Sequence, residues 1–143
     1  MNIPFSPPDI TEEEIEAVAE VMRSGWITTG PKTKELERKM AEFTHTNRGV
    51  CINSATSCME MALRLFEIGP GDEVIVPAYT YTASASVVCH VGATLRLVDV
   101  EKGTFHIDYA AVESMINENT KAIIPVDVGG VMVDYDRIRA IVE

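Results

Sequence analysis

The chain has 143 residues, of which 46% are hydrophobic, and this length and composition are typical of one globular domain. Twenty-two acidic residues against twelve basic ones give a net charge of -10, which argues against a nucleic-acid partner because phosphate contacts need clustered Lys and Arg. No stretch approaches the ~20 apolar residues of a membrane span, and the first residues lack the features of a signal peptide, so we expect a cytoplasmic protein without a membrane partner.

Two helices are predicted in the first part of the chain. Thr11 and Glu14 form a capping-box pattern, and apolar residues then recur at helical spacing until Ser24, which predicts a helix with one buried face. A second helix is expected to begin near Pro31, because proline is tolerated in a first turn. We assign residues 1–48 to an N-terminal helical arm.

From residue 49 the pattern changes to short apolar runs that alternate with segments of helical spacing. The runs predict strands at residues 49–53, 73–78, 94–100 and 122–128. Connections of helical length favour parallel pairing, with helices on both faces of the sheet. We therefore predict an α/β fold of three αβα layers with a mostly parallel mixed sheet.

The last predicted helix, capped by Asp134, has no stop signal before Glu143, so we expect residues 49–143 to be the first part of an α/β domain, truncated at its C-terminal end.

The turn at residues 53–57 lies where the first predicted strand ends and a helix begins. A helix N-terminus offers free N–H groups and a favourable dipole to a phosphate. Ser54 or Thr56 could equally cap the helix without any ligand, because Ser and Thr do so routinely. The turn contains no glycine, which argues against a Rossmann dinucleotide site.

A second candidate segment, residues 77–82, follows the second predicted strand. Open α/β sheets bind ligands at this carboxyl edge, where Tyr79 and Tyr81 could flank a planar ring. Aromatic residues at a strand end also serve packing alone, so the segment by itself names no ligand. No metal site is predicted, because the cysteines form no CxxC pair and the histidines show no ligand spacing.

Four motifs, taken together, resemble those of the DegT/StrS family of sugar aminotransferases. They are residues 25–31 (GWITTGP), 53–56 (NSAT), 68–77 (IGPGDEVIVP) and 120–126 (TKAIIPV), in matching order and spacing. The resemblance implies the large domain of a fold-type-I enzyme that uses pyridoxal 5'-phosphate (PLP). It also implies amino transfer from an amino acid, commonly glutamate, to a keto-sugar carried on a nucleotide diphosphate. A homodimer is implied as well, since fold-type-I sites lie between two subunits.

By position, the resemblance assigns cofactor-binding roles to Ser54, Ala55, Thr56, Ser57 and Tyr81. Thr56 and Ser57 would hold the cofactor phosphate, with Ser54 and Ala55 shaping the turn, and Tyr81 would stack on the pyridine ring. Trp26, Thr28 and Tyr79 are further candidates for the substrate pocket. Asp127 stands where the family usually has histidine, and it is assigned no role.

The family's cofactor-binding lysine and the aspartate that pairs with the pyridine nitrogen fall beyond Glu143, so no catalytic residue is assigned. The lysines that are present lie in charged or turn segments and are not predicted to be nucleophilic. We therefore expect the fragment to be inactive and to bind the cofactor weakly at best, so that it does not retain the PLP that the complete protein would hold. Two alternatives stay open: a non-catalytic relative that binds PLP or a sugar as a sensor, and a structural α/β module in which Tyr81 packs in a core.

Overall fold

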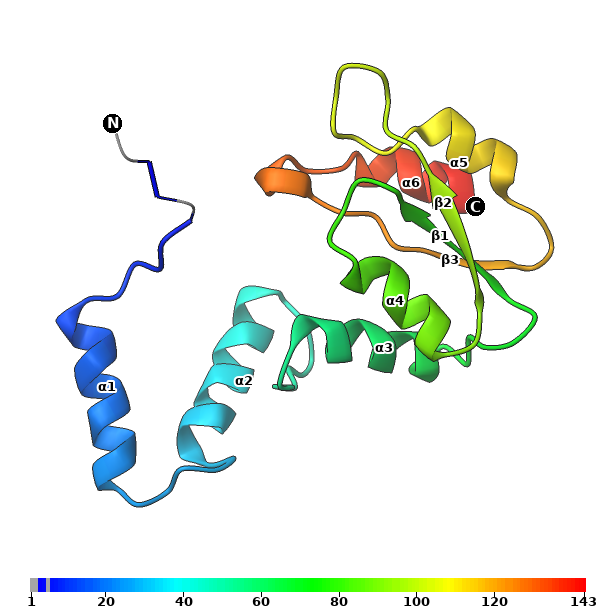
Figure 1. Ribbon diagram of the computed structural model, residues 1–143. Helices are drawn as coiled ribbons and strands as arrows, with labels where there is room; N and C mark the ends of the chain where they lie inside the picture. Colours follow the sequence, from blue (N-terminus) through cyan, green and yellow to red (C-terminus); the bar gives the residue numbers. More distant parts are fainter. Residues whose placement is uncertain (1–2, 5) are drawn as a thin grey trace. The chain divides into compact units, whose positions relative to one another are not determined.

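The computed structural model describes residues 3–4 and 6–143. The chain forms two compact units, residues 1–51 (unit 1) and residues 52–143 (unit 2). Unit 1 contains α1 (Glu12–Arg23) and α2 (Pro31–Phe43). Unit 2 contains α3 (Ala55–Leu65), β1 (Glu73–Pro77), α4 (Ala83–His90), β2 (Thr94–Val98), α5 (Tyr109–Met115), β3 (Thr120–Ile123), the 3-10 helix η1 (Val128–Gly130) and α6 (Tyr135–Val142) (Figure 1).

The capping box predicted for α1 is confirmed. Thr11 has an extended backbone and its side chain accepts a hydrogen bond from the N–H of Glu13, while its own N–H donates to the Glu14 carboxylate at 2.7 Å. Hydrogen bonds from Thr11 hold the pKa of Glu14 below its ordinary value of 4.5, so this carboxylate stays ionised at neutral pH. The sequence therefore located the start of α1 correctly.

The buried face predicted for α1 is wrong, because neither α1 nor α2 has a buried residue. The large apolar side chains of both helices are exposed, namely Ile15, Val18, Met22, Leu36, Met40 and Phe43. Helical spacing determines which side chains share a face, but it does not determine whether another element covers that face.

Three parallel strands form the sheet of unit 2, in the order β2-β1-β3. Glu73 at the start of β1 lies opposite Thr94 of β2 and Thr120 of β3, so the carboxyl ends of the three strands lie at one edge. The predicted parallel pairing is confirmed.

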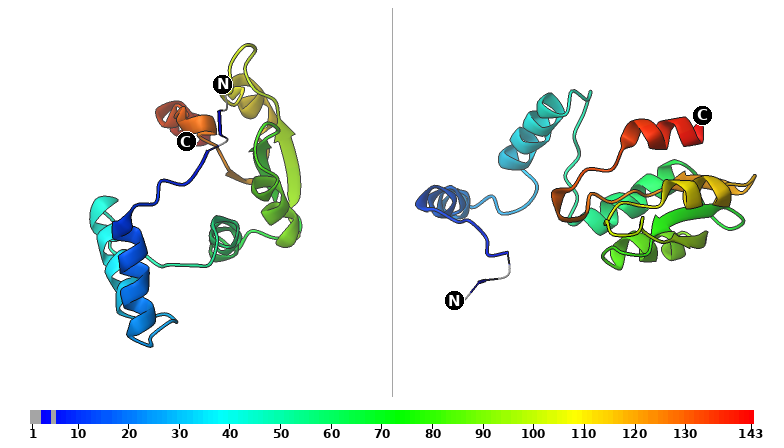
Figure 2. Two further views of the ribbon diagram at one scale, coloured as in Figure 1. Left: turned by 60° about the vertical axis from the view of Figure 1, so that its left-hand side comes forward. Right: turned by 90° about the horizontal axis from the view of Figure 1, so that it is seen from above.

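Helices cover both faces of this sheet (Figure 2). Alternate residues of a strand point to opposite faces. On one side Val74 and Val76 pack in a buried cluster with residues of α3 and α4, among them Leu63 and Val88. On the other side Ile75 packs in a cluster with α5 and α6. The predicted three-layer αβα architecture is therefore confirmed.

The strand predicted at residues 49–53 is wrong, since these residues form no helix or strand. The N–H of Cys51 donates instead to the side-chain carboxylate of Glu37 at 3.0 Å. An apolar run becomes a strand only when a neighbouring strand accepts and donates its backbone hydrogen bonds, and within the described part of the chain this segment has no such neighbour.

Candidate functional site

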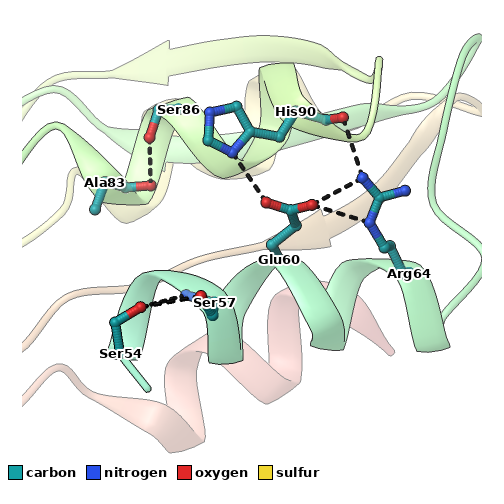
Figure 3. Close-up of polar contacts among 7 residues, drawn as sticks. All are labelled: Ser54, Ser57, Glu60, Arg64, Ala83, Ser86 and His90. Atoms are coloured by element: carbon teal, nitrogen blue, oxygen red, sulfur yellow. Dashed lines mark hydrogen bonds and ion pairs between the residues drawn. The ribbon is translucent and has the colours of Figure 1, made fainter. Parts of the chain in front are cut away.

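The first turn of α3 begins at Ser54, whose backbone is extended. Its side-chain oxygen accepts a hydrogen bond from the N–H of Ser57 at 3.1 Å, and its hydroxyl donates to the Ser57 hydroxyl at 3.0 Å (Figure 3). The carbonyl of Ser54 accepts from the N–H of Cys58, also at 3.1 Å. Ser54 is thus the helix cap, as the capping alternative predicted.

Capping by Ser54 leaves two donors of this turn free. Among the described residues, the N–H groups of Ala55 and Thr56 have no hydrogen-bond acceptor. The first N–H groups of a helix point along its axis and carry the positive end of its dipole, so together they favour an anion. Capping and anion binding are therefore compatible at this turn, and the two interpretations of the sequence do not exclude each other.

The segment between β1 and α4 carries both tyrosines predicted as site residues. The ring of Tyr79 stacks on Phe105, with ring centroids 5.2 Å apart and planes at 19°. Tyr81 is 81% exposed. The alternative in which Tyr81 packs in a core is therefore wrong, and its ring is available to a ligand. Tyr79 packs against the loop after β2, and its use by a substrate stays a prediction.

The two candidate elements lie at the same end of the layer that α3 and α4 form. The two helices pack against each other, and Ser54 before α3 and Ala83 at the start of α4 lie at the same end of the pair (Figure 3). Tyr81 comes two residues before Ala83 and follows the carboxyl end of β1. The carboxyl edge of a parallel sheet is where α/β folds bind ligands.

Trp26 and Thr28 line an open cavity of about 440 Å³ within unit 1, together with residues of α1 and α2. The indole N–H of Trp26 donates to the carbonyl of Thr29 at 3.0 Å. A Cβ atom at Gly30 would overlap the Trp26 ring, so only glycine permits this approach. A role of Trp26 and Thr28 in a substrate pocket stays a prediction.

The sequence model of the DegT/DnrJ/EryC1/StrS aminotransferase family matches residues 8–143. The chain belongs to this family. Spr1654 from Streptococcus pneumoniae, named as a sugar aminotransferase, is 60% identical with a TM-score of 0.93, and the match covers 99% of this chain and 36% of Spr1654. Its structures include a PLP form and a PMP form.

Two further solved structures are also similar to this chain. DesV of S. venezuelae, solved with a ketimine intermediate, is 37% identical with a TM-score of 0.85, over 91% of this chain and 35% of DesV. An aminotransferase from Psychrobacter cryohalolentis is 34% identical with a TM-score of 0.88, over 96% of this chain and 36% of its own. The chain thus spans about a third of the length of these relatives. The predicted resemblance to this PLP-dependent family is confirmed.

Asp127, to which the sequence assigned no role, makes two hydrogen bonds in the structure. Its carboxylate accepts hydrogen bonds from the N–H of Val133 at 2.8 Å and from the Tyr135 hydroxyl at 3.0 Å. Burial and the bond to Asp127 raise the pKa of Tyr135, so the phenol stays protonated and can donate. Asp127 therefore closes the loop between β3 and α6, where Gly129 and Gly130 adopt φ values of 63° and 79°.

Within the residues that the structure describes, no His, Cys, Asp or Glu side chains gather in a group that could hold a metal ion. The same residues contain no helix with the length and apolar character that a membrane crossing requires.

Proposed function

We propose that this chain provides the phosphate grip and the ring contact for PLP in a sugar aminotransferase. The observation that carries the proposal is the pair of free N–H groups of Ala55 and Thr56 in the first turn of α3, together with the exposed Tyr81, which comes two residues before α4 begins. Membership of a PLP-dependent family and the PLP form of Spr1654 support PLP over other phosphorylated ligands.

The chemistry of the turn fits a phosphate monoester. Two backbone N–H groups can donate to its oxygens, and the hydroxyls of Thr56 and Ser57 can add further donors. Hydrogen bonds to a charged phosphate are about twice as strong as neutral ones. Tyr81 offers a free aromatic face for the pyridine ring. When bound, PLP supplies the electron sink that amino transfer requires.

The proposal extends to the substrates and to the oligomeric state of the complete protein. We propose that a nucleotide-linked keto-sugar accepts the amino group and that an amino acid, most commonly glutamate, donates it. The name of Spr1654 as a sugar aminotransferase supports a sugar acceptor. Trp26, Thr28 and Tyr79 would contribute to the substrate pocket. In the complete protein we propose residues 1–48 as a helical arm and residues 49–143 as the first part of the PLP domain of a cytoplasmic homodimer.

Titration of the labelled chain by NMR tests the cofactor assignment. Pyridoxine 5'-phosphate is the suitable ligand, because it has no aldehyde that would react with surface lysines. We expect it to shift the amide signals of Ala55, Thr56 and Ser57 and to bind roughly tenfold or more tightly than pyridoxine, which lacks the phosphate. Tyr81→Ala should weaken both ligands equally, by about 2- to 10-fold, while Tyr81→Phe should not. Equal affinity for the two ligands would contradict the phosphate site.

Residues 1–143 alone are expected to show no amino transfer. The Lys121 ammonium donates to the carbonyl of Glu118 near the amino end of β3, whereas Tyr81 follows the carboxyl end of the parallel β1. Lys39 pairs with Glu35 in unit 1. The measurement is conversion of PLP to its amino form by glutamate, followed by absorbance, with a complete family enzyme as positive control. Turnover by the chain alone would refute this expectation.

A further inference from the structure

A polar cluster joins α3 to α4 at some distance from the free N–H groups. One oxygen of the Glu60 carboxylate accepts from the Arg64 guanidinium, at 3.0 Å from Nε and 2.8 Å from Nη2. The other lies 3.0 Å from Nδ1 of His90 on α4 (Figure 3). Arg64 also donates to the carbonyl of His90 at 3.4 Å. We call Glu60, Arg64 and His90 the interhelix clamp.

The protonation state of the clamp follows from its hydrogen bonds. Arg64 and then His90 hold the pKa of Glu60 below its ordinary value of 4.5, so the carboxylate is ionised at neutral pH. An ionised carboxylate can only accept hydrogen bonds. The proton of this contact is therefore on Nδ1 of His90, which makes His90 the donor.

The clamp lies beside the apolar contact between the two helices. Met59 and Leu63, one helical turn apart, join the buried cluster of the α3–α4 layer, and Glu60 and Arg64 form the neighbouring row on α3. Apolar contact is non-directional, so by itself it tolerates sliding and rotation of one helix on the other. A hydrogen bond with a fixed donor and acceptor restricts both movements.

The position of α3 depends mainly on α4. Most of the neighbours of α3 belong to α4 and not to the strands. The polypeptide enters α4 directly after Tyr81. The distance between the free N–H groups of α3 and the ring of Tyr81 therefore depends on how α3 is placed along α4.

We infer that Glu60, Arg64 and His90 are positioning residues, which set the first turn of α3 relative to Tyr81 so that one ligand reaches both its phosphate donors and its ring contact. This inference rests on the proposed function, because it concerns the same cofactor site. None of the three side chains is required to touch the ligand. Their effect is transmitted through the placement of α3 on α4.

The test compares pyridoxine 5'-phosphate with pyridoxine on the 143-residue chain. The ratio of the two affinities is the readout, because partial unfolding of a variant lowers both affinities equally and leaves the ratio unchanged. We call the affinity for pyridoxine 5'-phosphate divided by that for pyridoxine the phosphate preference. We expect Glu60→Ala and His90→Ala to lower it by about 3- to 10-fold, the effect of one hydrogen bond. His90→Asn should restore it to within about twofold, since the amide of Asn can donate from nearly the same place as Nδ1.

A matched control is available in unit 1, where Arg38 and Glu42 form an exposed ion pair along α2. Glu42→Ala removes a carboxylate from such a pair and should leave the phosphate preference unchanged. If the wild-type chain prefers the phosphorylated ligand but Glu60→Ala and His90→Ala do so equally well, the positioning role is overturned and the proposed function stands. If the wild-type chain shows no preference, the proposed function fails and the positioning role fails with it.

Discussion

Ala55→Pro is expected to weaken binding of pyridoxine 5'-phosphate by roughly tenfold or more and to leave α3 folded. Proline has no N–H, so the change removes one of the two free donors, and a hydrogen bond to a charged group is worth about 1.5–3 kcal/mol. Ala55 is the first residue of α3, a position that proline favours. Ser54 before it has φ of -162° and ψ of 155°, the extended backbone that a following proline requires.

Two comparisons separate the lost donor from other effects of this change. Ala55→Gly keeps the N–H and should keep the affinity to within about fivefold, because glycine is less favourable than alanine in a helix by about 1 kcal/mol. Glu12→Pro makes the same replacement at the first position of α1, after an extended Thr11, and should not affect the ligand. Calorimetric titration gives the affinities, and circular dichroism reports the helix content. Unchanged affinity in Ala55→Pro, with α3 intact, would show that the phosphate does not bind at this turn.

Ile75→Ala is expected to lower the free energy of unfolding of unit 2 by about 3 kcal/mol. Ile75 is fully buried in the middle of the central strand and packs against α5 and α6. Truncation removes apolar burial and leaves a cavity that the surrounding side chains fill only partly. The measurement is urea unfolding followed through the amide signals of β1 and α4.

Leu97→Ala provides the control for this prediction, because Leu97 lies on the neighbouring strand β2 and is 54% exposed. It should change the free energy of unfolding by about 0.5 kcal/mol or less. Equal effects of Ile75→Ala and Leu97→Ala would contradict the burial pattern from which the αβα layers are inferred.

Local chemistry explains which parts of the fold could be predicted from the sequence. The helix starts at Thr11, Ser54 and Asp134 are set by short side chains that bond to backbone groups within three residues, and all three act as caps in the structure. The strand predicted at residues 49–53 failed because a strand also requires a partner, which the pattern of one segment does not specify. For the same reason the exposed apolar face of α1 could not be told from a buried one.

The residues of the candidate site also differ in whether local sequence or tertiary packing determines their contacts. Thr56 and Tyr81 could be proposed from the sequence because each has its place in a short motif, and their roles stay predictions. Glu60 and His90 were missed, since they are thirty positions apart and meet only after α3 has packed on α4. Asp127 was missed as well, because its partners lie in a loop whose path is decided by glycines with positive φ.

The donors of Ala55 and Thr56 belong to the polypeptide backbone, and this has a consequence for engineering the site. Most side-chain replacements at Ala55 would leave both N–H donors of the proposed phosphate site in place, so this position can be changed to suit a different neighbouring surface at little cost in binding. Selectivity among phosphorylated molecules would then have to be introduced elsewhere, through the hydroxyl of Ser57 or the ring at position 81.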